Sequence, residues 1–182
     1  PASTFDVNRD WKAEMSIGKR SLAEGSTLYT PAERIKRDET VWTMVQAVLA
    51  PIQFIVFAIS LIFVVRYLTS GEGYLIATIS ICVKTFILYT IMVTGAIWEK
   101  VVFGQYLFAR AFFWEDVFSM LVLALHTAYL VVTFFALGGP ALQMGIALAA
   151  YATYAINAGQ FILKLRQARL QQPRIAGAGE PA

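Results

Sequence analysis

Four long apolar stretches divide this chain and leave few choices for its fold. They cover about residues 42–67, 74–98, 117–137 and 141–163. Each is at least as long as the about 20 residues that a helix needs to cross the hydrocarbon core of a bilayer. Inside lipid the backbone must satisfy its own hydrogen bonds, and a helix does this within one segment. The chain is 58% hydrophobic, whereas soluble domains average about 45–50%. We therefore predict an all-α, polytopic membrane protein built as a four-transmembrane-helix bundle.

The connections between these stretches predict how the helices are joined and oriented. Short turns at 69–73 and 138–140 make the first two and the last two helices antiparallel hairpins. These turns carry no Lys or Arg, whereas the segments 34–37, 99–116 and 164–174 all carry basic residues. Because positively charged loops stay in the cytoplasm, we expect both termini and the 99–116 segment on the cytoplasmic side.

The two ends of the chain differ from the apolar part in composition. Residues 1–27 are polar, of mixed charge and without periodicity, which predicts a flexible N-terminal arm. Thr30 is followed by a proline and, three residues on, by Glu33, a pattern typical of a helix start. Residues 171–182 predict a disordered tail. The transmembrane domain is thus expected over residues 28–170.

A single cysteine, Cys82, and a single histidine, His126, exclude several classes of site. One cysteine excludes an intramolecular disulfide and a Cys-rich metal cluster, and one histidine excludes a bis-histidine haem within one chain. The sequence also lacks a Gly-rich phosphate loop and a Ser/His/Asp set. We therefore expect no cofactor and no intrinsic metal. The net charge of +3 comes from residues that flank the apolar stretches, so we expect no nucleic-acid partner.

The segment from Trp98 to Asp116 concentrates the polar chemistry of the chain. It holds three carboxylates, two cations and seven aromatic residues within 19 residues. The aromatic residues suit either a belt at the lipid headgroups or a wall for a flat, conjugated ligand. The carboxylates are Glu99, Glu115 and Asp116; Asp116 also suits the dipole of a helix start. Partial removal from water raises the pKa of a carboxyl group and lets it act as a general acid near neutral pH.

Two ionisable residues, Lys84 and His126, lie near the middle of predicted spans. A charge at this depth is costly. Lys84 is therefore expected to face a polar cavity, to bind an anionic ligand group, or to lose its proton. His126 is expected either to bond to a neighbouring helix or to serve as a metal ligand or proton carrier.

Other polar residues recur at the spacing that places them on one helix face. Because lipid cannot satisfy polar groups, these stripes should point into the bundle and form interhelical hydrogen bonds. The stripes are Gln46, Gln53, Ser60 and Tyr67 in the first span, Glu115, Ser119, His126 and Thr133 in the third, and Gln143, Ala150, Asn157 and Lys164 in the fourth.

Several stretches of the chain resemble a known family. The longest are Trp-Glu-Lys-Val-Val-Phe-Gly-Gln-Tyr at 98–106 and Phe-Phe-Trp-Glu-Asp at 112–116, supported by 28–38, 41–51 and 149–161. These strings resemble the bacteriochlorophyllide 3-vinyl hydratases of phototrophic bacteria. The resemblance implies a membrane lyase of bacteriochlorophyll synthesis, located in the bacterial inner membrane, cytoplasmic or intracytoplasmic. It would add water to the C3-vinyl group of chlorophyllide a or of 3-vinyl bacteriochlorophyllide and form a 3-(1-hydroxyethyl) product.

The site hypothesis for such a reaction starts from the carboxylates. Glu115 or Glu99 would donate the proton, and another of the three carboxylates, Asp116 included, would activate the water. The substrate-binding residues that we predict are Trp98, Tyr106 and Trp114 against the macrocycle, His126 on its magnesium, and Lys84, Lys100 or Arg110 on its propionate. The other expected partners are the lipid bilayer, a second copy of the chain, or other enzymes of pigment synthesis.

Two further function classes stay open at the level of sequence. A non-catalytic pigment-binding or assembly subunit of a photosynthetic complex would use the same aromatic residues but would need no acid–base pair. A small transporter would explain Lys84 and the polar stripes, although the sequence shows no internal repeat.

Overall fold

The computed structural model describes residues 28–176, with side chains described to Arg166. The predicted arm, residues 1–27, and residues 177–182 lie outside the described part. Within it every regular element is a helix, and four helices are long and apolar enough to cross a membrane. The all-α prediction is confirmed, and the four helices suggest a multi-pass membrane protein. The elements are α2 (Pro31–Glu39), α3 (Val41–Ser70), α4 (Tyr74–Phe103), α5 (Phe113–Phe134) and α6 (Pro140–Ala176).

The short helix α2 begins where the sequence predicts a helix start. Thr30 is the N-cap: its side chain accepts a hydrogen bond from the backbone N–H of Glu33 at 3.3 Å. The Glu33 carboxylate in turn accepts from the backbone N–H of Thr30 at 2.7 Å. This reciprocal pair satisfies two N–H groups that the first helical turn leaves free.

Glycine sets the turn that joins α3 to α4. Gly71 and Gly73 have φ angles of 74° and 85°, in the left-handed region that other residues enter at a cost. Gly71 also closes α3 by donating its N–H to the carbonyl of Tyr67 at 2.8 Å. Pro51 lies inside α3 without ending the helix.

The second hairpin departs from the predicted boundaries at both of its helices. α5 ends at Phe134, three residues before the predicted end of the third span. Ala136 and Gly138 follow with positive φ angles of 51° and 69°, which a helix does not accommodate. α6 begins at Pro140 and runs to Ala176, so the first part of the predicted disordered tail, residues 171–176, is helical. Gln, Arg and Ala in this stretch are good helix formers.

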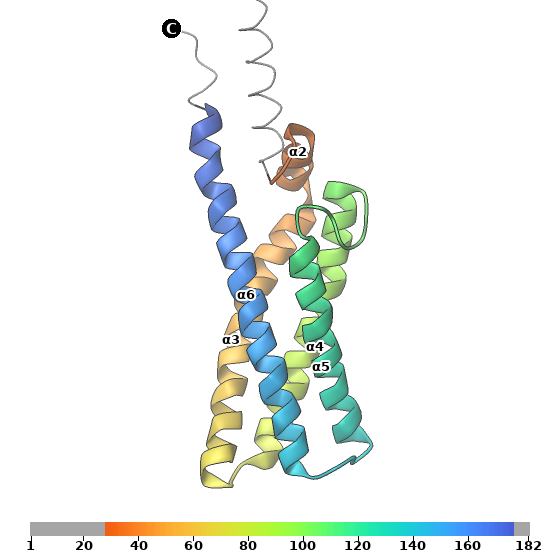
Figure 1. Ribbon diagram of the computed structural model, residues 1–182, viewed down its shortest axis with the longest axis vertical. Helices are drawn as coiled ribbons and strands as arrows, with labels where there is room; N and C mark the ends of the chain where they lie inside the picture. The colour runs from red at the N-terminus through yellow and green to blue at the C-terminus, as the bar shows by residue number, and fades with distance from the viewer. Residues whose placement is uncertain (1–27, 177–182) are drawn as a thin grey trace, which may run out of the picture.

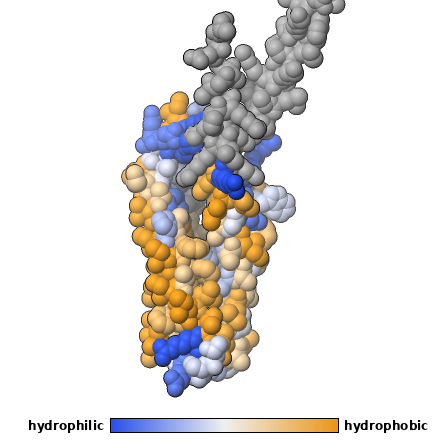
Figure 2. Space-filling view, turned by 90° about the vertical axis from the view of Figure 1, so that its left-hand side faces the viewer, coloured by the Kyte–Doolittle hydropathy of each residue, from blue (hydrophilic) through white to orange (hydrophobic). Residues whose placement is uncertain are grey.

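The two hairpins lie side by side in one elongated bundle (Figure 1). Both short turns are at one end of the bundle, and α2 and the α4–α5 connection are at the other (Figure 1). A band of hydrophobic residues covers the middle of the molecule between hydrophilic ends (Figure 2). The exposed hydrophobic side chains of the long helices include Phe54, Phe86 and Leu163. An apolar outer surface of this height is what lipid contact requires.

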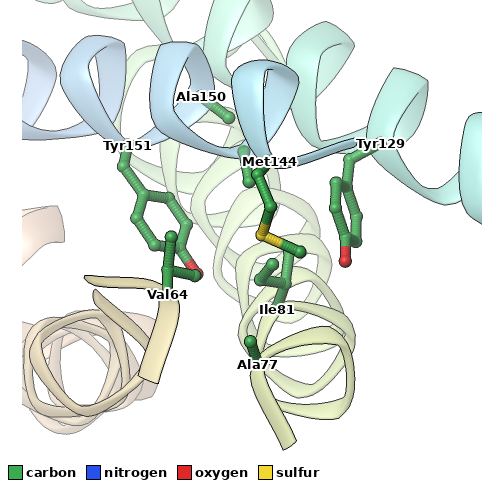
Figure 3. Close-up of a cluster of buried hydrophobic side chains, with 8 residues drawn as sticks. Val64, Ala77, Ile81, Tyr129, Met144, Ala150 and Tyr151 are labelled. Atoms are coloured by element: carbon green, nitrogen blue, oxygen red, sulfur yellow. The ribbon is translucent and has the colours of Figure 1, made fainter. Parts of the chain in front are cut away.

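The core near the two turns is built by all four long helices (Figure 3). It consists of Val64, Ala77, Ile81, Tyr129, Met144, Ala147, Ala150 and Tyr151. Small residues of α6 let its backbone come close to its neighbours. The larger side chains, among them Met144 and Tyr151, fill the space between the hairpins (Figure 3).

The polar stripes point inward and several of their residues form bonds between helices, as predicted, whereas the buried side chains of Gln53 and Thr133 have no hydrogen-bond partner among the described residues. Gln46 donates its side-chain N–H to Thr94 at 2.8 Å, which joins α3 to α4. Asn157 donates to Ser119 at 2.9 Å, which joins α6 to α5. The hydroxyl groups of Ser60 and Tyr151 lie 2.5 Å apart and join the two hairpins.

Lys84 and His126 form a polar contact at the centre of the bundle. Both side chains are fully buried. His126 donates its Nδ1–H to the carbonyl of Val122 at 2.8 Å, so its Nε2 accepts the hydrogen bond that Lys84 Nζ donates at 2.7 Å. The rings of Tyr154 and Tyr151 lie 4.1 and 5.3 Å from Nζ. Lys84 thus binds a neutral imidazole and aromatic faces, and no carboxylate among the described residues pairs with it.

This pair predicts an asymmetry between two substitutions. Lys84→Met removes the cost of burying the amine, which offsets the loss of the donor to His126 Nε2, so we expect little change in stability. His126→Leu leaves Lys84 without its acceptor and should lower the free energy of unfolding by about 1–3 kcal/mol. The double variant should recover most of that loss. Reversible unfolding in bicelles measures all three values. Equal destabilisation by both single substitutions would contradict this account of the pair.

Candidate active site

The structure brings the three carboxylates of the 98–116 segment to one end of the bundle, where α4 ends and α5 begins (Figure 1). Glu99 lies in the last turns of α4, and Glu115 and Asp116 lie in the first turn of α5. Although this end carries the long connection, the three side chains are only 4–8% exposed. Three carboxyl groups removed from water at one place are costly unless each has a partner.

Glu99 and Asp116 find partners in the connection that they enclose. Asp116 accepts the backbone N–H of Phe108 at 2.7 Å, and Glu99 accepts that of Ala109 at 3.3 Å. Phe108 has a φ of 61°, an unusual conformation for a bulky residue. The two carboxyl groups also lie close enough to influence one another. Two buried carboxyl groups this close do not both ionise readily, so Glu99 and Asp116 form a carboxyl pair that can hold and release a proton.

Glu115 has a different partner from the other two carboxylates. Lys164 of α6 lies 2.6 Å from its Oε2, and the Lys164 ammonium group is 5.0 Å from the ring of Phe112. The ion pair compensates the negative charge of Glu115 in a mostly buried position. Lys164 belongs to the inward stripe predicted for the fourth span, but the sequence alone did not show that it would meet Glu115.

A cluster of aromatic rings packs directly beside these carboxylates. Its members are Tyr29, Trp98, Phe103, Phe112 and Phe161. Trp98 lies 5.6 Å from Phe112, edge to face, and donates its indole N–H to Thr43 at 2.9 Å. These rings therefore contact one another, and Trp98 lies inside the cluster. Tyr29 and Phe161 were not predicted, because they come from segments far from residues 98–116 in the sequence.

The segment before α2 covers this aromatic cluster. Tyr29 is 4% exposed and stacks on Phe103 with 5.8 Å between ring centroids. Burial raises the pKa of the Tyr29 hydroxyl, and the Arg37 guanidinium, 4.8 Å from the ring, acts in the opposite direction. Tyr29 therefore stays a neutral, packed residue at ordinary pH.

Three of the predicted substrate-binding residues lie on the outside of the connection. Tyr106 and Trp114 are 60% and 67% exposed, and Arg110 is exposed as well. Lys100 is nearby: it donates to the carbonyl of Gly104 at 2.7 Å and lies 5.3 Å from the Tyr106 ring. This outer face combines aromatic area with two cations, a combination that suits a flat, acidic ligand.

The structure does not bring Lys84 and His126 to the carboxylates. Lys84 is 15 residues before Glu99 on α4, which corresponds to about 22 Å of helix. His126 is 10 residues after Asp116 on α5, or about 15 Å. The Nε2 atom that a metal would need already accepts the Lys84 hydrogen bond. Among the described residues no three His, Cys, Asp or Glu side chains are grouped for a metal ion.

The arrangement suits acid–base chemistry with divided roles. A carboxyl pair that carries a proton can donate it, and an ionised carboxylate paired with a lysine can accept one. Both lie in one buried layer between α4, α5 and α6.

Comparison with known proteins identifies the family. The family model for 2-vinyl bacteriochlorophyllide hydratase matches residues 29–167. The chain belongs to this family. It is therefore an enzyme, a hydro-lyase of bacteriochlorophyll biosynthesis. The match covers α3, α4 and α5, the part of α6 up to residue 167, and every residue of the candidate site.

Two curated 2-vinyl bacteriochlorophyllide hydratases show how similar the members are. The protein from Rhodobacter capsulatus is 71% identical over 145 residues, which is 79% of this chain and 84% of that protein. The protein from Cereibacter sphaeroides is 72% identical over 144 residues, 79% of this chain and 89% of that protein. No solved structure matches the chain significantly.

The contacts of Asp116 predict how the connection responds to its removal. Asp116→Ala removes the acceptor of the Phe108 N–H and the carboxyl group beside Glu99. We expect the free energy of unfolding to fall by about 1–3 kcal/mol. Amide hydrogen exchange of residues 104–112 should then become at least about tenfold faster, while α3 and α6 stay protected. Arg110→Ala, which removes an exposed side chain from the same connection, is the control and should change little. Unaltered exchange in Asp116→Ala would show that this carboxylate does not hold the connection.

Proposed function

We propose that this chain adds water to the vinyl group of a bacteriochlorophyllide and forms a 1-hydroxyethyl group. Chlorophyllide a and 3-vinyl bacteriochlorophyllide are the proposed substrates. The observation that carries the proposal is the layer of three buried carboxylates, two of them close neighbours and the third paired with Lys164. The two similar proteins support the proposal, because both are named for the hydration of 2-vinyl bacteriochlorophyllide.

The reaction needs one proton and one water molecule at neighbouring carbons. The Glu99–Asp116 pair donates a proton to the terminal vinyl carbon. The positive charge that forms at the inner carbon is delocalised over the conjugated macrocycle. Glu115 removes a proton from the water as its oxygen bonds to the inner carbon. In each turnover the Glu99–Asp116 pair loses one proton and Glu115 gains one. Proton exchange with solvent then restores both groups to their starting states.

In this proposal the outer face of the connection binds the macrocycle. Tyr106 and Trp114 offer exposed rings for stacking. Arg110 or Lys100 pairs with the propionate of the pigment, and Trp98 supports the inner cluster. Lys84 and His126 lie too far along the helices to share this contact, and they join the hairpins instead.

The vinyl group must pass the connection to reach the carboxylates. With 4–8% of their area exposed, these groups meet a substrate only if residues 104–112 move. The hydrogen bonds from Phe108 and Ala109 to Asp116 and Glu99 are the contacts that such a movement breaks. Substrate entry would thus release the same carboxyl groups that the reaction uses.

The proposal includes an orientation in the bacterial inner membrane. The end of the bundle with the carboxylates faces the cytoplasm, because Lys and Arg flank the helices there and are absent from both short turns. Association with a second copy or with other pigment-synthesis enzymes stays a prediction.

The first test is whether the chain converts the pigment. Membranes containing the protein are incubated with chlorophyllide a, and the pigment is analysed by mass and absorbance. We expect the mass of one added water and a blue shift of the red band, absent from control membranes. Pigment that is retained but unchanged, in an assay validated with an active relative, would favour a non-catalytic pigment-binding subunit.

The second test concerns the carboxylates. Glu99→Gln keeps the shape of the side chain but cannot donate an acidic proton, so turnover should fall at least about 100-fold, while pigment binding persists. Glu115→Gln should also abolish turnover, because its amide cannot accept the proton from water. Glu72→Gln, an exposed carboxylate in the turn at the opposite end, is the matched control. Full activity in both Glu99→Gln and Glu115→Gln would refute the mechanism.

A further inference from the structure

Below the carboxylate layer, α5 and α6 enclose a short polar section between two hydrogen bonds. The upper bond joins Lys164 to Glu115 at 2.6 Å, and the lower bond joins Asn157 to Ser119 at 2.9 Å. The seven residues between Asn157 and Lys164 on α6 correspond to about 10 Å. Gln160 lies between them, at the spacings of three and four residues that place side chains on one helix face. The section therefore adjoins Glu115 directly.

Two oxygen atoms in this section have no hydrogen-bond partner among the residues that the structure describes. They are Oδ1 of Asn157 and Oε1 of Gln160, and both are buried from solvent. Asn157 is only 8% exposed, and its Nδ2 is already used by the bond to Ser119. Buried polar atoms in native proteins almost always have a partner, protein or water. The unused groups point to a ligand, because no described residue donates a hydrogen bond to either oxygen.

The chemistry of the two atoms defines that ligand. Both are carbonyl oxygens, so they accept hydrogen bonds and cannot donate them. The ligand must therefore bring donors, carry no negative charge, and be small enough to fit between two helices. Water meets all three conditions, since it donates two hydrogen bonds and can bind next to a carboxylate.

We propose that Asn157 and Gln160 hold the water molecule that adds to the vinyl group. This inference rests on the proposed function and deepens it. At rest the two O–H groups of the water face the two amide oxygens; in the reaction the O–H group on Gln160 turns to Glu115, this O–H bond breaks, and its proton passes to Glu115. The oxygen forms the C–O bond at the inner vinyl carbon, while the terminal carbon receives a proton from the Glu99–Asp116 pair. The two amide oxygens orient the water so that a lone pair faces the carbon.

A competition between water and methanol tests this assignment. Asn157→Ala removes one acceptor and enlarges the space by the volume of the lost amide. The variant should turn over at least about tenfold more slowly, with pigment affinity unchanged in an absorbance titration. In mixtures of water and methanol, the ratio of methyl-ether product to alcohol product should rise about tenfold. The wild-type site excludes methanol, which has one more carbon than water, only because it fits closely around water.

The controls separate a water site from a structural role. Thr153→Ala lies one turn away on α6, where its hydroxyl only bonds to its own helix, and its product ratio should equal that of the wild type. Gln160→Leu, at a less buried position, provides a second variant should Asn157→Ala fail to fold; it should slow turnover at unchanged pigment affinity.

The product ratio makes the outcome decisive. It is independent of the amount of folded protein, so a structural defect lowers both products equally. An unchanged ratio in Asn157→Ala, together with normal turnover in Gln160→Leu, would overturn the water site while leaving the hydratase function intact. A wild-type protein that forms neither product would instead count against the proposed function itself.

Discussion

Polar groups on the four long helices have to find partners inside the bundle, because lipid provides none. This constraint organises the whole molecule. Apolar side chains cover the outer surface, and the interior carries bonds that join the hairpins, such as Lys84 to His126 and Ser60 to Tyr151. Lys84 illustrates how strongly the constraint acts: a lysine in the membrane centre is held by one imidazole nitrogen and aromatic faces.

The same constraint shapes the end of the bundle where the site lies. The connection between α4 and α5 leaves the backbone N–H groups of Phe108 and Ala109 without helical partners, and the carboxyl groups of Asp116 and Glu99 satisfy them. These two carboxyl groups therefore have a structural task and, in our proposal, a chemical one. Buried polar groups that serve function at the expense of local stability are common at active sites. In our proposal, movement of residues 104–112 ends the structural role of these carboxyl groups and makes them available for the reaction.

The three carboxylates differ only in what surrounds them, and this difference divides their roles. Glu99 and Asp116 are close neighbours that each accept a backbone N–H, whereas Glu115 pairs with Lys164. Membership in the 2-vinyl bacteriochlorophyllide hydratase family connects this arrangement to the addition of water. The unpartnered oxygens of Asn157 and Gln160 extend the site down between α5 and α6 and offer a place for that water.

The sequence by itself determined the four helices, their pairing into hairpins, the cap at Thr30 and the inward direction of the polar stripes. Length, hydropathy and periodicity fix these features within each segment. It also singled out Glu99, Glu115 and Asp116, because they interrupt apolar sequence. Only the tertiary structure decided that Glu99 meets Asp116, that Lys164 meets Glu115, and that Lys84 occupies the free nitrogen of His126. These contacts depend on the rotation and register of one helix against another, which the periodicity of a single helix does not set.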